Sequence, residues 1–558
     1  MDKYVLGLNI SNHDSAAALI KNGELLKFIE QERISRNKMA LGEPPIDAIK
    51  KCLSACNITI NDISAISVGM DWKYRNEIYK MTVDEQKKYK KFEDPKWFLP
   101  KEFLSCNLPP IHFIRHHLAH ASSAYRLSGF KDCAVLVIDN RGEDSSTSLG
   151  IAQNGKITFF KQINIHNSLG IYYNRAARFT GLYGKYREVG KFMGLASYGI
   201  PSFKMPLSPS RDKLLFKTLP NIENLSIFDS IGARTQQFKE YFERNCFPYE
   251  SENSEEIMSY ANFAASVQKS LEDTILDFVK ELKEVTNMDN IVISGGVALN
   301  CSANGKIEQS GLFNNIYIPP FSSDAGTAVG AALEVYRELY DKNYISKPLK
   351  NAGLGLSYSD EEIINELKAF SSEIKFNLLS DNNLSSFVAN EISKGKIIGW
   401  MQGCFEAGPR SLGYRSILAD PRKRRSLIKL NRIKEREMWR PIAPSVLFEE
   451  YSSYFEGSPY SKYFMNVATI VKPLKRNIIP AVVHVDYSAR PQVVTNKQKK
   501  YYDLIKAFYS LTGVPVLCNT SFNRRGEPLV NSPKDAIECF LNTSIDLLVI
   551  GNYVVERV

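Results

Sequence analysis

The sequence predicts an α/β protein with two domains, the first of which contains a duplicated unit. A chain of 558 residues is too long for one ordinary hydrophobic core. Two stretches about 130 residues apart repeat the order strand, polar loop, strand, Asn-Gly turn and strand. Helix-like and strand-like segments then alternate until prolines and glycines interrupt the pattern near residues 347–355. We therefore expect one domain over residues 1–350 and a second over residues 351–558.

The repeat pairs residues 4–29 with residues 134–163. The first copy reads YVLGLNI, SNHD, SAAALI, an Asn-Gly turn and ELLKFI, and the second reads AVLVID, NRGED, STSLGIA, an Asn-Gly turn and KITFFKQI. Asn-Gly between apolar runs is the strongest short signal of a β-hairpin. Asn9 and Asp139 occupy matching places at the end of the first strand of each copy. In the actin, hexokinase and sugar-kinase fold, two such loops face each other around phosphate, and two unrelated hairpins are the alternative interpretation.

The remainder of the first domain alternates helix and strand. Residues 255–284 carry apolar side chains at helical spacing. A strand (NIVISGG), the start of a helix near 297–304, a second strand (NIYIPP) and a small-residue helix after SSDAG follow.

Composition limits the classes of function. Hydrophobic residues make up 44% and charged residues 24% of the chain, which is typical of a folded globular protein. No apolar run approaches the roughly 18 residues of a membrane span, and the chain opens on a strand rather than on a signal peptide. The nine cysteines include no C-x-x-C pair, so neither a disulfide framework nor a cysteine zinc site is expected. We expect a cytoplasmic protein without a membrane partner.

The net charge of +10 does not indicate a nucleic-acid partner. The basic runs at 87–91 and 422–425 lack the interleaved aromatic residues of a nucleic-acid surface, and the first run is best interpreted as solvated surface.

Two histidines suggest a metal site in the first domain. His116 and His120 occur in H-H-L-A-H-A, and their spacing places both imidazoles on one face of a helix. The zinc-protease motif H-E-x-x-H is excluded because His117 stands where that motif has Glu. Asp139 and Asp324 are candidates for further ligands. A structural helix with surface histidines is the alternative.

A glycine-rich loop and two polar loops offer further candidates. Ser294, Gly295 and Gly296 follow a strand and precede a helix, as at nucleotide sites, although a tight packing turn would look the same. No Walker A motif occurs. His13, in the first hairpin loop, is either a base toward a substrate hydroxyl or a loop cap with its neighbouring aspartate. Lys191, in E-V-G-K, either contacts substrate or forms a salt bridge.

The second domain concentrates arginines in loops. Arg410, Arg440 and Arg490 each adjoin a proline, and a fourth basic segment, N-T-S-F-N-R-R-G-E-P, begins at residue 519. Guanidinium groups bind phosphate with two parallel hydrogen bonds, so convergent arginines suit a small, doubly charged phosphate donor. Structural ion pairs remain an alternative for any single arginine.

At this point several motifs together resemble a known family. They are H-D-S-A-A-A-L-I, E-Q-E-R-I-S-R-N-K, H-H-L-A-H-A, E-V-G-K-F-M-G-L-A-S-Y-G, I-S-G-G-V-A-L-N, G-P-R-S-L-G-Y-R-S-I-L-A-D-P-R and N-T-S-F-N-R-R-G-E-P. The chain resembles the O-carbamoyltransferases of the NodU and tobramycin carbamoyltransferase (TobZ) type over nearly its whole length. The resemblance implies an actin-like (ASKHA) duplicated first domain and a YrdC-like α/β second domain. It also implies that carbamoyl phosphate and ATP, with Mg, form carbamoyladenylate in the second domain, and that a hydroxylated acceptor receives the carbamoyl group in the first.

The resemblance assigns roles to residues by motif. The metal shell, with iron or another divalent ion, would comprise His116, His120, Asp139 and Asp324. Carbamoyl phosphate would be held by Arg410, Lys434, Arg440, Arg490, Asn519 and Arg525, with Arg440 also catalytic. The nucleotide would lie along Ser294, Gly295, Gly296, Asn300 and Lys191. His13 would be catalytic beside the acceptor. The chain departs from the family pattern at Ser411, usually Ala, and at Val189, in a loop usually written E-G-K, which makes Glu188 less secure.

Other functions are weighed against this one. A tRNA-modifying threonylcarbamoyl-type transferase and a sugar kinase of the actin-like fold are the alternatives, but neither explains the arginine-rich second domain. A nickel-hydrogenase maturation carbamoyltransferase would carry cysteine zinc fingers, which this sequence lacks. The identity of the acceptor is left open, as is the oligomeric state, with a homodimer as one option. Residues 73–103, rich in Lys and Tyr, either line the acceptor pocket or form a surface insertion.

Overall fold

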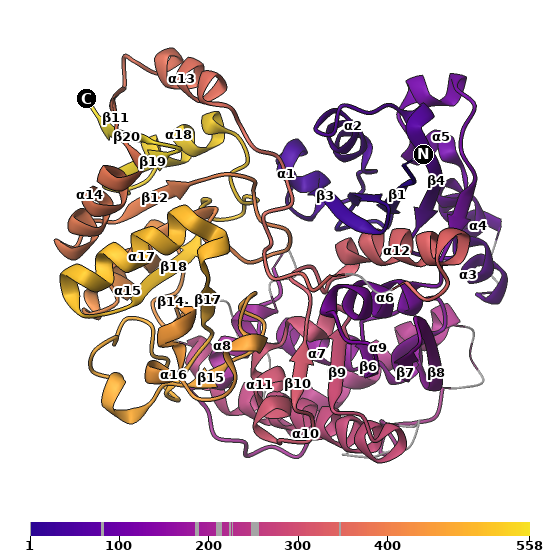
Figure 1. Ribbon diagram of the computed structural model, residues 1–558. Coiled ribbons are helices and arrows are strands. Elements are labelled where there is room, and N and C mark those ends of the chain that lie inside the picture. Colours follow the sequence, from indigo (N-terminus) through magenta and orange to yellow (C-terminus); the bar gives the residue numbers. More distant parts are fainter. Residues whose placement is uncertain are drawn as a thin grey trace. The chain divides into compact units, whose positions relative to one another are not determined.

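The chain divides into two compact units (Figure 1). The computed structural model describes residues 2–79, 83–184, 189–207, 215–222, 225, 227–246, 256–344 and 347–558. The first unit comprises Met1–Ser35 and Met39–Leu349, and the second comprises Arg36–Lys38 and Lys350–Val558. Within the described ranges, every helix is too short or too polar to cross a bilayer. All nine cysteines are free thiols.

The first unit contains two five-stranded sheets of identical topology. Their strand orders are β3-β2-β1-β4-β5 and β10-β9-β6-β7-β8. In each sheet the first three strands form an antiparallel meander, and the fourth and fifth run parallel to the first. The strands of the first sheet are β1 (Tyr4–Asn9), β2 (Ala16–Lys21), β3 (Glu24–Glu30), β4 (Ile63–Val68) and β5 (Ile111–Phe113), and those of the second are β6 (Cys133–Ile138), β7 (Ser145–Gln153), β8 (Lys156–Asn164), β9 (Asn290–Ser294) and β10 (Asn315–Tyr317). This duplicated arrangement is the actin-like fold, and it confirms the predicted repeat.

The two hairpin turns form for the predicted reason. Asn22 and Gly23 both have positive φ, at 49° and 86°, and Asn154 and Gly155 do so at 51° and 74°. Consecutive positive φ values define the tight turn whose twist matches that of the flanking strands, and Asn-Gly adopts it at the least steric cost.

Two helices pack between the sheets. α6 (His116–Ser128) packs on the second sheet, α12 (Thr327–Tyr340) packs on the first, and the two helices contact each other. A Cβ atom on Gly330 would lie 1.7 Å from the carbonyl oxygen of Ala119, so only glycine permits this close crossing. Each helix follows the last strand of one sheet and packs on the other sheet, which brings the starts of both helices to the ends of the central strands.

Among the remaining helices of the first unit, α2 (Ile46–Ser54) packs on the first sheet and α10 (Ala261–Thr286) packs on the second. α10 buries Phe263, Val267 and Phe278 at helical spacing and contacts β6, in keeping with the predicted helix. The others are α1 (Gln31–Ser35), α3 (Trp72–Ile78), α4 (Val83–Lys90), α5 (Pro95–Phe98), α7 (Leu169–Phe179), α8 (Gly190–Ala196), α9 (Ile227–Asn245) and α11 (Cys301–Gln309).

The second unit contains an eight-stranded mixed sheet of order β11-β20-β19-β12-β13-β18-β14-β17. Its strands are β11 (Ile374–Leu378), β12 (Ile398–Met401), β13 (Arg415–Ala419), β14 (Ala443–Leu447), β17 (Gln492–Val494), β18 (Val516–Ser521), β19 (Leu547–Ile550) and β20 (Tyr553–Arg557), and β15 (Thr469–Ile470) pairs separately with β16 (Ser488–Ala489). Its helices are α13 (Asp360–Ala369), α14 (Asp381–Ser393), α15 (Arg425–Ile433), α16 (Tyr451–Tyr454), α17 (Lys499–Thr512) and α18 (Pro533–Leu541).

A short excursion of the N-terminal part of the chain belongs to this second unit. Arg36 donates hydrogen bonds to the carbonyl oxygens of Pro528 and Leu529, and its guanidinium lies 3.6 Å from the carboxylate of Asp535. The sequence pattern gave no indication of this exchange, because residues 36–38 lie within an otherwise continuous first domain.

Candidate functional site

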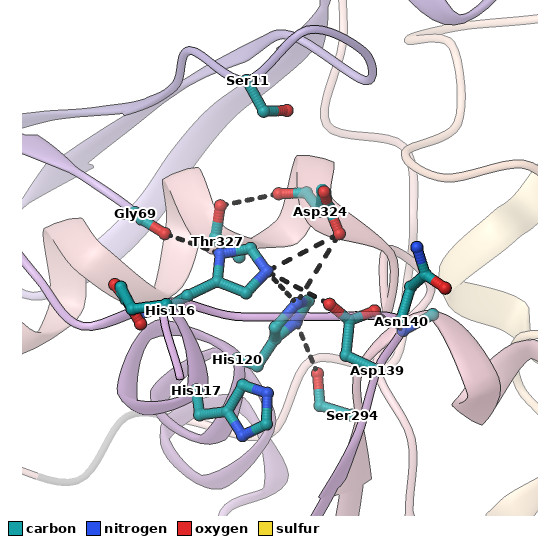
Figure 2. A network of polar contacts seen from close by, with 12 residues as sticks. Ser11, Gly69, His116, His117, His120, Asp139, Asn140, Ser294, Asp324 and Thr327 are labelled. Carbon is teal, nitrogen blue, oxygen red and sulfur yellow. Dashed lines mark hydrogen bonds and ion pairs between the residues drawn. The ribbon is translucent and has the colours of Figure 1, made fainter. Parts of the chain in front are cut away.

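Two histidines and two aspartates of the first unit converge on one point (Figure 2). His116 and His120 lie one turn apart at the start of α6, Asp139 follows β6, and Asp324 begins the short helix η8 (Asp324–Gly326) before α12. The Nε2 atoms of the two histidines are 3.1 Å apart, and Nε2 of His116 lies 3.4 Å from Oδ2 of Asp139. One ligand atom from each of the four residues lies within 4.8 Å of all the others. We call these four residues the acid–histidine cluster.

The donor set of this cluster fits a divalent transition metal. Oδ1 of Asp324 lies 3.7 Å from Nε2 of His116 and 3.9 Å from Nε2 of His120. Donors that share an ion at about 2.1 Å lie roughly 3.0 to 3.4 Å apart, so the observed separations need only small adjustments. Two imidazole nitrogens and two carboxylates suit iron, zinc or manganese better than calcium, which prefers oxygen alone.

Backbone groups orient the side chains of the acid–histidine cluster. Nδ1 of His116 lies 2.9 Å from the carbonyl oxygen of Gly69, which makes that nitrogen the proton donor and leaves Nε2 as the ligand atom. The backbone N–H of Gly296 donates to Oδ1 of Asp139 over 3.0 Å. His117, between the two ligand candidates in sequence, is directed elsewhere, with its Nδ1 2.6 Å from Oγ of Ser148.

Glu143 holds the helix that carries both histidines. Its Oε1 accepts hydrogen bonds from the backbone N–H groups of Asp71 and His116, each over 2.9 Å, and its side chain is 3% exposed. The carboxylate therefore links the first residue of α6 to the start of α3. Its negative charge also interacts favourably with the positive end of the α6 dipole. Sequence reasoning missed Glu143, although it lies in the second hairpin loop, N-R-G-E-D.

The electrostatics of the acid–histidine cluster favour a positive charge at its centre. Burial alone would lower the pKa of His116, but Asp139 and Asp324 outweigh burial and raise that pKa well above its usual value. Burial and the charge of His116 lower the pKa of His120 to about 4. Burial would raise the pKa of Asp139, but the two histidines hold it below its usual range. Burial and the charge of Asp139 would raise the pKa of Asp324, but His116 and His13 hold it below its usual range. Both carboxylates are therefore ionised and can serve as ligands to a cation.

His13 lies beside the acid–histidine cluster. Its Nε2 is 3.9 Å from Oδ2 of Asp324, and its Nδ1 is 3.4 Å from Oδ2 of Asp14. The N–H of Asp14 donates to the carbonyl oxygen of Met39 over 2.7 Å, and Oγ of Ser15 donates to the carbonyl of Glu43 over 2.5 Å. The loop is thus fastened directly after His13, whose imidazole is partly exposed.

The glycine-rich loop lies against the same cluster. Gly295 has φ +95°, and a Cβ atom there would lie 2.3 Å from the carbonyl oxygen of Ile138. The loop is therefore a tight packing turn as well as a neighbour of the cluster, because Oγ of Ser294 is 3.4 Å from Nδ1 of His120. The tight turn weighed for these glycines is present, and the nucleotide role stays a prediction.

The other two predicted nucleotide residues lie farther along the chain. The side chain of Asn300 caps α11 by accepting from the N–H of Ala303 over 3.0 Å, and it exchanges two hydrogen bonds of 3.0 Å with Gln268. Asn300 is buried. Lys191 lies in the first turn of α8 and is half-buried.

In the second unit, the positive charges of neighbouring side chains lower the pKa values of Lys434 and Arg436. Burial and the charge of Arg436 hold the pKa of Lys434 well below its usual value, and Arg440 acts in the same direction. Burial and the charges of Arg440 and Arg490 lower the pKa of Arg436 to about 9. We call Lys434, Arg436, Arg440 and Arg490 the basic cluster. Three of them were predicted from the sequence, and Arg436 was not.

The remaining predicted anion-binding residues differ in accessibility. Asn519 is 1% exposed, and its amide donates to the carbonyl oxygen of Ser411, Oγ of Ser445 and Oε1 of Gln492 while its oxygen accepts from Oγ of Ser411. This network fixes the segment that begins with Arg410, so Asn519 acts on that loop rather than facing a ligand. Arg525 is exposed and donates to the carbonyl oxygen of Glu435 over 3.2 Å. Glu435 lies between Lys434 and Arg436 of the basic cluster in the sequence.

Two family models match this chain. The model described as "Carbamoyltransferase N-terminus" matches residues 4–333, and that described as "Carbamoyltransferase C-terminus" matches residues 389–557. The first match alone covers more than half of the chain.

Curated relatives match over most of the chain. An uncharacterized protein of Synechocystis sp. is 33% identical over 99% of this chain and 97% of its own length, and the nodulation protein NolNO of Sinorhizobium fredii is 35% identical over 98% of this chain and 80% of its own length. A 3'-hydroxymethylcephem-O-carbamoyltransferase of Amycolatopsis lactamdurans is 30% identical over 53% of this chain and 54% of its own length. Among solved structures, full-length HypF in a phosphate- and nucleotide-bound form aligns at 12% identity over 61% of this chain and 56% of that chain, with a TM-score of 0.34. The fold of the first unit is assigned from its strand order.

Proposed function

Because the chain belongs to the carbamoyltransferase family, we propose that it is an ATP-dependent O-carbamoyltransferase whose two clusters serve successive steps. The observation that carries this proposal is the pairing of opposite chemistries: an acid–histidine cluster in the first unit and a basic cluster in the second. The name of the cephem relative places transfer on a hydroxyl oxygen in that protein, which supports the same atom type here.

The first step is assigned to the basic cluster. Carbamoyl phosphate carries two negative charges, and guanidinium groups match phosphate in charge and shape. We propose that Arg410, Arg440, Arg490 and Arg525 bind it, with Arg440 also assisting the reaction, and that Asn519 positions the loop of Arg410. Water converts the mixed anhydride into carbamate and phosphate. A carbamate oxygen then attacks the α-phosphorus of ATP, supplied with Mg, which forms carbamoyladenylate and releases pyrophosphate.

The second step is assigned to the acid–histidine cluster. His116, His120, Asp139 and Asp324 would hold a divalent cation, with iron as our choice, and this cation would polarise an oxygen of the carbamoyladenylate. His13 lies beside Asp324 and accepts the proton of the acceptor hydroxyl. The acceptor oxygen forms a bond to the carbamoyl carbon, and AMP leaves as the carbon–oxygen bond to its phosphate breaks.

The nucleotide part of carbamoyladenylate is assigned to the loop beside the cluster. Ser294, Gly295 and Gly296 lie against His120 and Asp139, so a phosphate held near the cation would adjoin this loop. Asn300 supports the helix that follows the loop, and Lys191 would provide a cation for the AMP phosphate.

Product analysis tests the proposal. The enzyme is incubated with a pool of hydroxylated metabolites, ATP-Mg and carbamoyl phosphate, and each co-substrate is omitted in turn. We expect pyrophosphate, AMP and a product with one added carbamoyl group only in the complete mixture. Phosphorylated product from ATP alone would contradict the proposal and support a kinase.

A further inference from the structure

Gln268 lies at the centre of a buried amide network in the first unit. Its side chain is buried on α10, which packs on α11. Nε2 of Gln268 donates to Oδ1 of Asn300 over 3.0 Å, and Oε1 of Gln268 accepts from Nδ2 of Asn300 over 3.0 Å. Two amides that exchange both hydrogen bonds fix each other, because neither can turn over alone without placing like atoms together.

The backbone decides which way this amide pair points. Oδ1 of Asn300 also accepts from the N–H of Ala303 over 3.0 Å, as the cap of α11. A backbone N–H can only donate, so the oxygen of Asn300 must face the helix and its nitrogen must face Oε1 of Gln268. The orientation of Gln268 is therefore dictated by the start of α11.

Two further side chains require the same orientation of Gln268. The hydroxyl of Tyr173, on α7, donates to Oε1 over 2.7 Å, and Oε1 of Glu272, one turn along α10, accepts from Nε2 over 2.7 Å. Burial and the charge of Glu272 raise the pKa of Tyr173 well above its usual value, so the phenol keeps the proton that it donates. Gln268 thus uses both of its amide hydrogens and both lone pairs of its oxygen.

The network ends at the glycine-rich loop. Asn300 follows η7 (Gly296–Leu299), and its N–H donates to the carbonyl oxygen of Val297 over 2.9 Å. At the other end of η7, the N–H of Gly296 donates to Oδ1 of Asp139 over 3.0 Å. Residues 296–300 are therefore held by the acid–histidine cluster at one end and by the amide network at the other.

A contact between α10 and α11 made only for stability would not need these groups. Burying polar side chains has a desolvation cost that apolar side chains avoid, and a fully satisfied network offsets this cost while it specifies one arrangement. The arrangement specified here is that of the loop that begins beside His120 and Asp139.

We propose that Gln268, supported by Tyr173 and Glu272, is a positioning residue that holds residues 294–300 in the conformation that receives the AMP part of carbamoyladenylate. This inference rests on the proposed function, because it takes the adenylate as the ligand of this loop. The three side chains act through Asn300, which fixes the point where η7 ends and α11 begins.

The test measures AMP binding to the purified full-length enzyme by calorimetry, together with the melting temperature. Gln268→Met removes the amide at similar volume, Asn300→Ala removes its partner, and a double variant combines the two changes. Tyr173→Phe removes a single donor, and it provides a milder variant if Gln268→Met does not fold.

Glu272 offers a matched pair of variants. Glu272→Gln retains an oxygen that can accept from Gln268, whereas Glu272→Leu does not. Asp273→Asn is the control at the next residue of α10, where the carboxylate is partly exposed and pairs with Lys269 over 2.5 Å.

We expect Gln268→Met and Asn300→Ala each to raise the Kd for AMP by about three- to tenfold, as for the loss of one hydrogen bond. The double variant should bind AMP no more weakly than Asn300→Ala alone, because Gln268 acts through Asn300. Tyr173→Phe should have a smaller effect in the same direction. Glu272→Leu should weaken AMP binding, Glu272→Gln should recover most of it, and Asp273→Asn should match the wild type.

The inference is overturned if Asn300→Ala weakens AMP binding while Gln268→Met and Tyr173→Phe leave it unchanged. It is also overturned if the effects of Gln268→Met and Asn300→Ala multiply in the double variant. AMP binding that Asn300→Ala leaves unchanged would instead reject the nucleotide site that the proposed function assigns to this loop, and the inference with it.

Discussion

Imidazole nitrogens and carboxylates converge in the acid–histidine cluster of the first unit, whereas ammonium and guanidinium groups make up the basic cluster of the second. In the first, the two Nε2 atoms of His116 and His120 are 3.1 Å apart, with Asp139 and Asp324 alongside. In the second, Lys434 and Arg436 have lowered pKa values because neighbouring positive charges add to burial. Each cluster brings together groups of like charge, the carboxylates in the first and the cations in the second. A bound ligand of the opposite charge would relieve the repulsion between them. This difference supports the proposal of one cation site and one anion site in the same chain.

The largest effect is expected from removing the two histidines. The double variant His116→Ala, His120→Ala should lose the bound metal and lower carbamoyl transfer by at least about 100-fold, because polarisation by a metal is worth several kcal/mol. Metal content and product formation are measured together, with His484→Ala in the second unit as the control. Unchanged carbamoyl transfer by a variant without bound metal would show that the acid–histidine cluster takes no part in the reaction.

Arg440→Ala is expected to impair the first step by about 10- to 100-fold, since a charge-assisted hydrogen bond contributes about 1.5 to 3 kcal/mol. The metal content should stay at the wild-type level, because Arg440 belongs to the other unit. Pyrophosphate release reports the first step and elemental analysis reports the metal. Full turnover by this variant would exclude the proposed donor site.

Gly295→Ala tests whether the loop beside the acid–histidine cluster depends on glycine. The left-handed φ and the short distance to the carbonyl oxygen of Ile138 should destabilise the first unit by about 2 kcal/mol. Gly232→Ala, in α9, is the control, since a Cβ atom there meets nothing within 4 Å. Thermal unfolding should separate the two variants, and equal melting temperatures would show that the loop tolerates a side chain.

Glu143→Gln is expected to give the smallest effect, a loss of metal affinity of about tenfold, because the amide supports the backbone of His116 less well than the carboxylate. Asp144→Asn is the matched control on the neighbouring residue, which pairs with Arg115 over 2.8 Å at a half-exposed position. Competition with a chelator of known affinity measures both variants. A larger loss of metal affinity for Asp144→Asn would contradict this role of Glu143 and indicate that Asp144 supports the metal site instead.

The sequence predicted the fold where local patterns dictate it and missed contacts that depend on distant segments. The two Asn-Gly turns and the alternating strands revealed the duplicated sheets, and motif resemblance named the four residues of the acid–histidine cluster. Glu143 was missed because its role arises only where a hairpin loop meets the starts of two helices, which leave no shared pattern in the sequence. Arg436 was passed over because it adjoins no proline, whereas a neighbouring proline drew attention to Arg410, Arg440 and Arg490.

The matched strand ends of the duplicated sheets show the same limit. Asn9 is the last residue of β1, and Asp139 is the first residue after β6, so both lie at the strand ends that the repeat indicated. The amide of Asn9 donates to the carbonyl oxygen of Asp14 over 2.7 Å and closes its own loop, whereas Asp139 joins the acid–histidine cluster. Repetition thus predicted the position of both residues but not the division of roles, which depends on which helix starts beside each strand.

Pyrophosphate release, measured alongside carbamoylated product, tests the division of labour most directly. The comparison uses the wild type, the His116→Ala, His120→Ala protein and the Arg440→Ala protein, each with ATP-Mg, carbamoyl phosphate and a hydroxylated acceptor pool. We predict that the histidine variant still releases pyrophosphate and accumulates carbamoyladenylate without product, and that the arginine variant loses both activities together. Equal loss of pyrophosphate release in the two variants, or product from the histidine variant, would contradict the assignment of one step to each cluster.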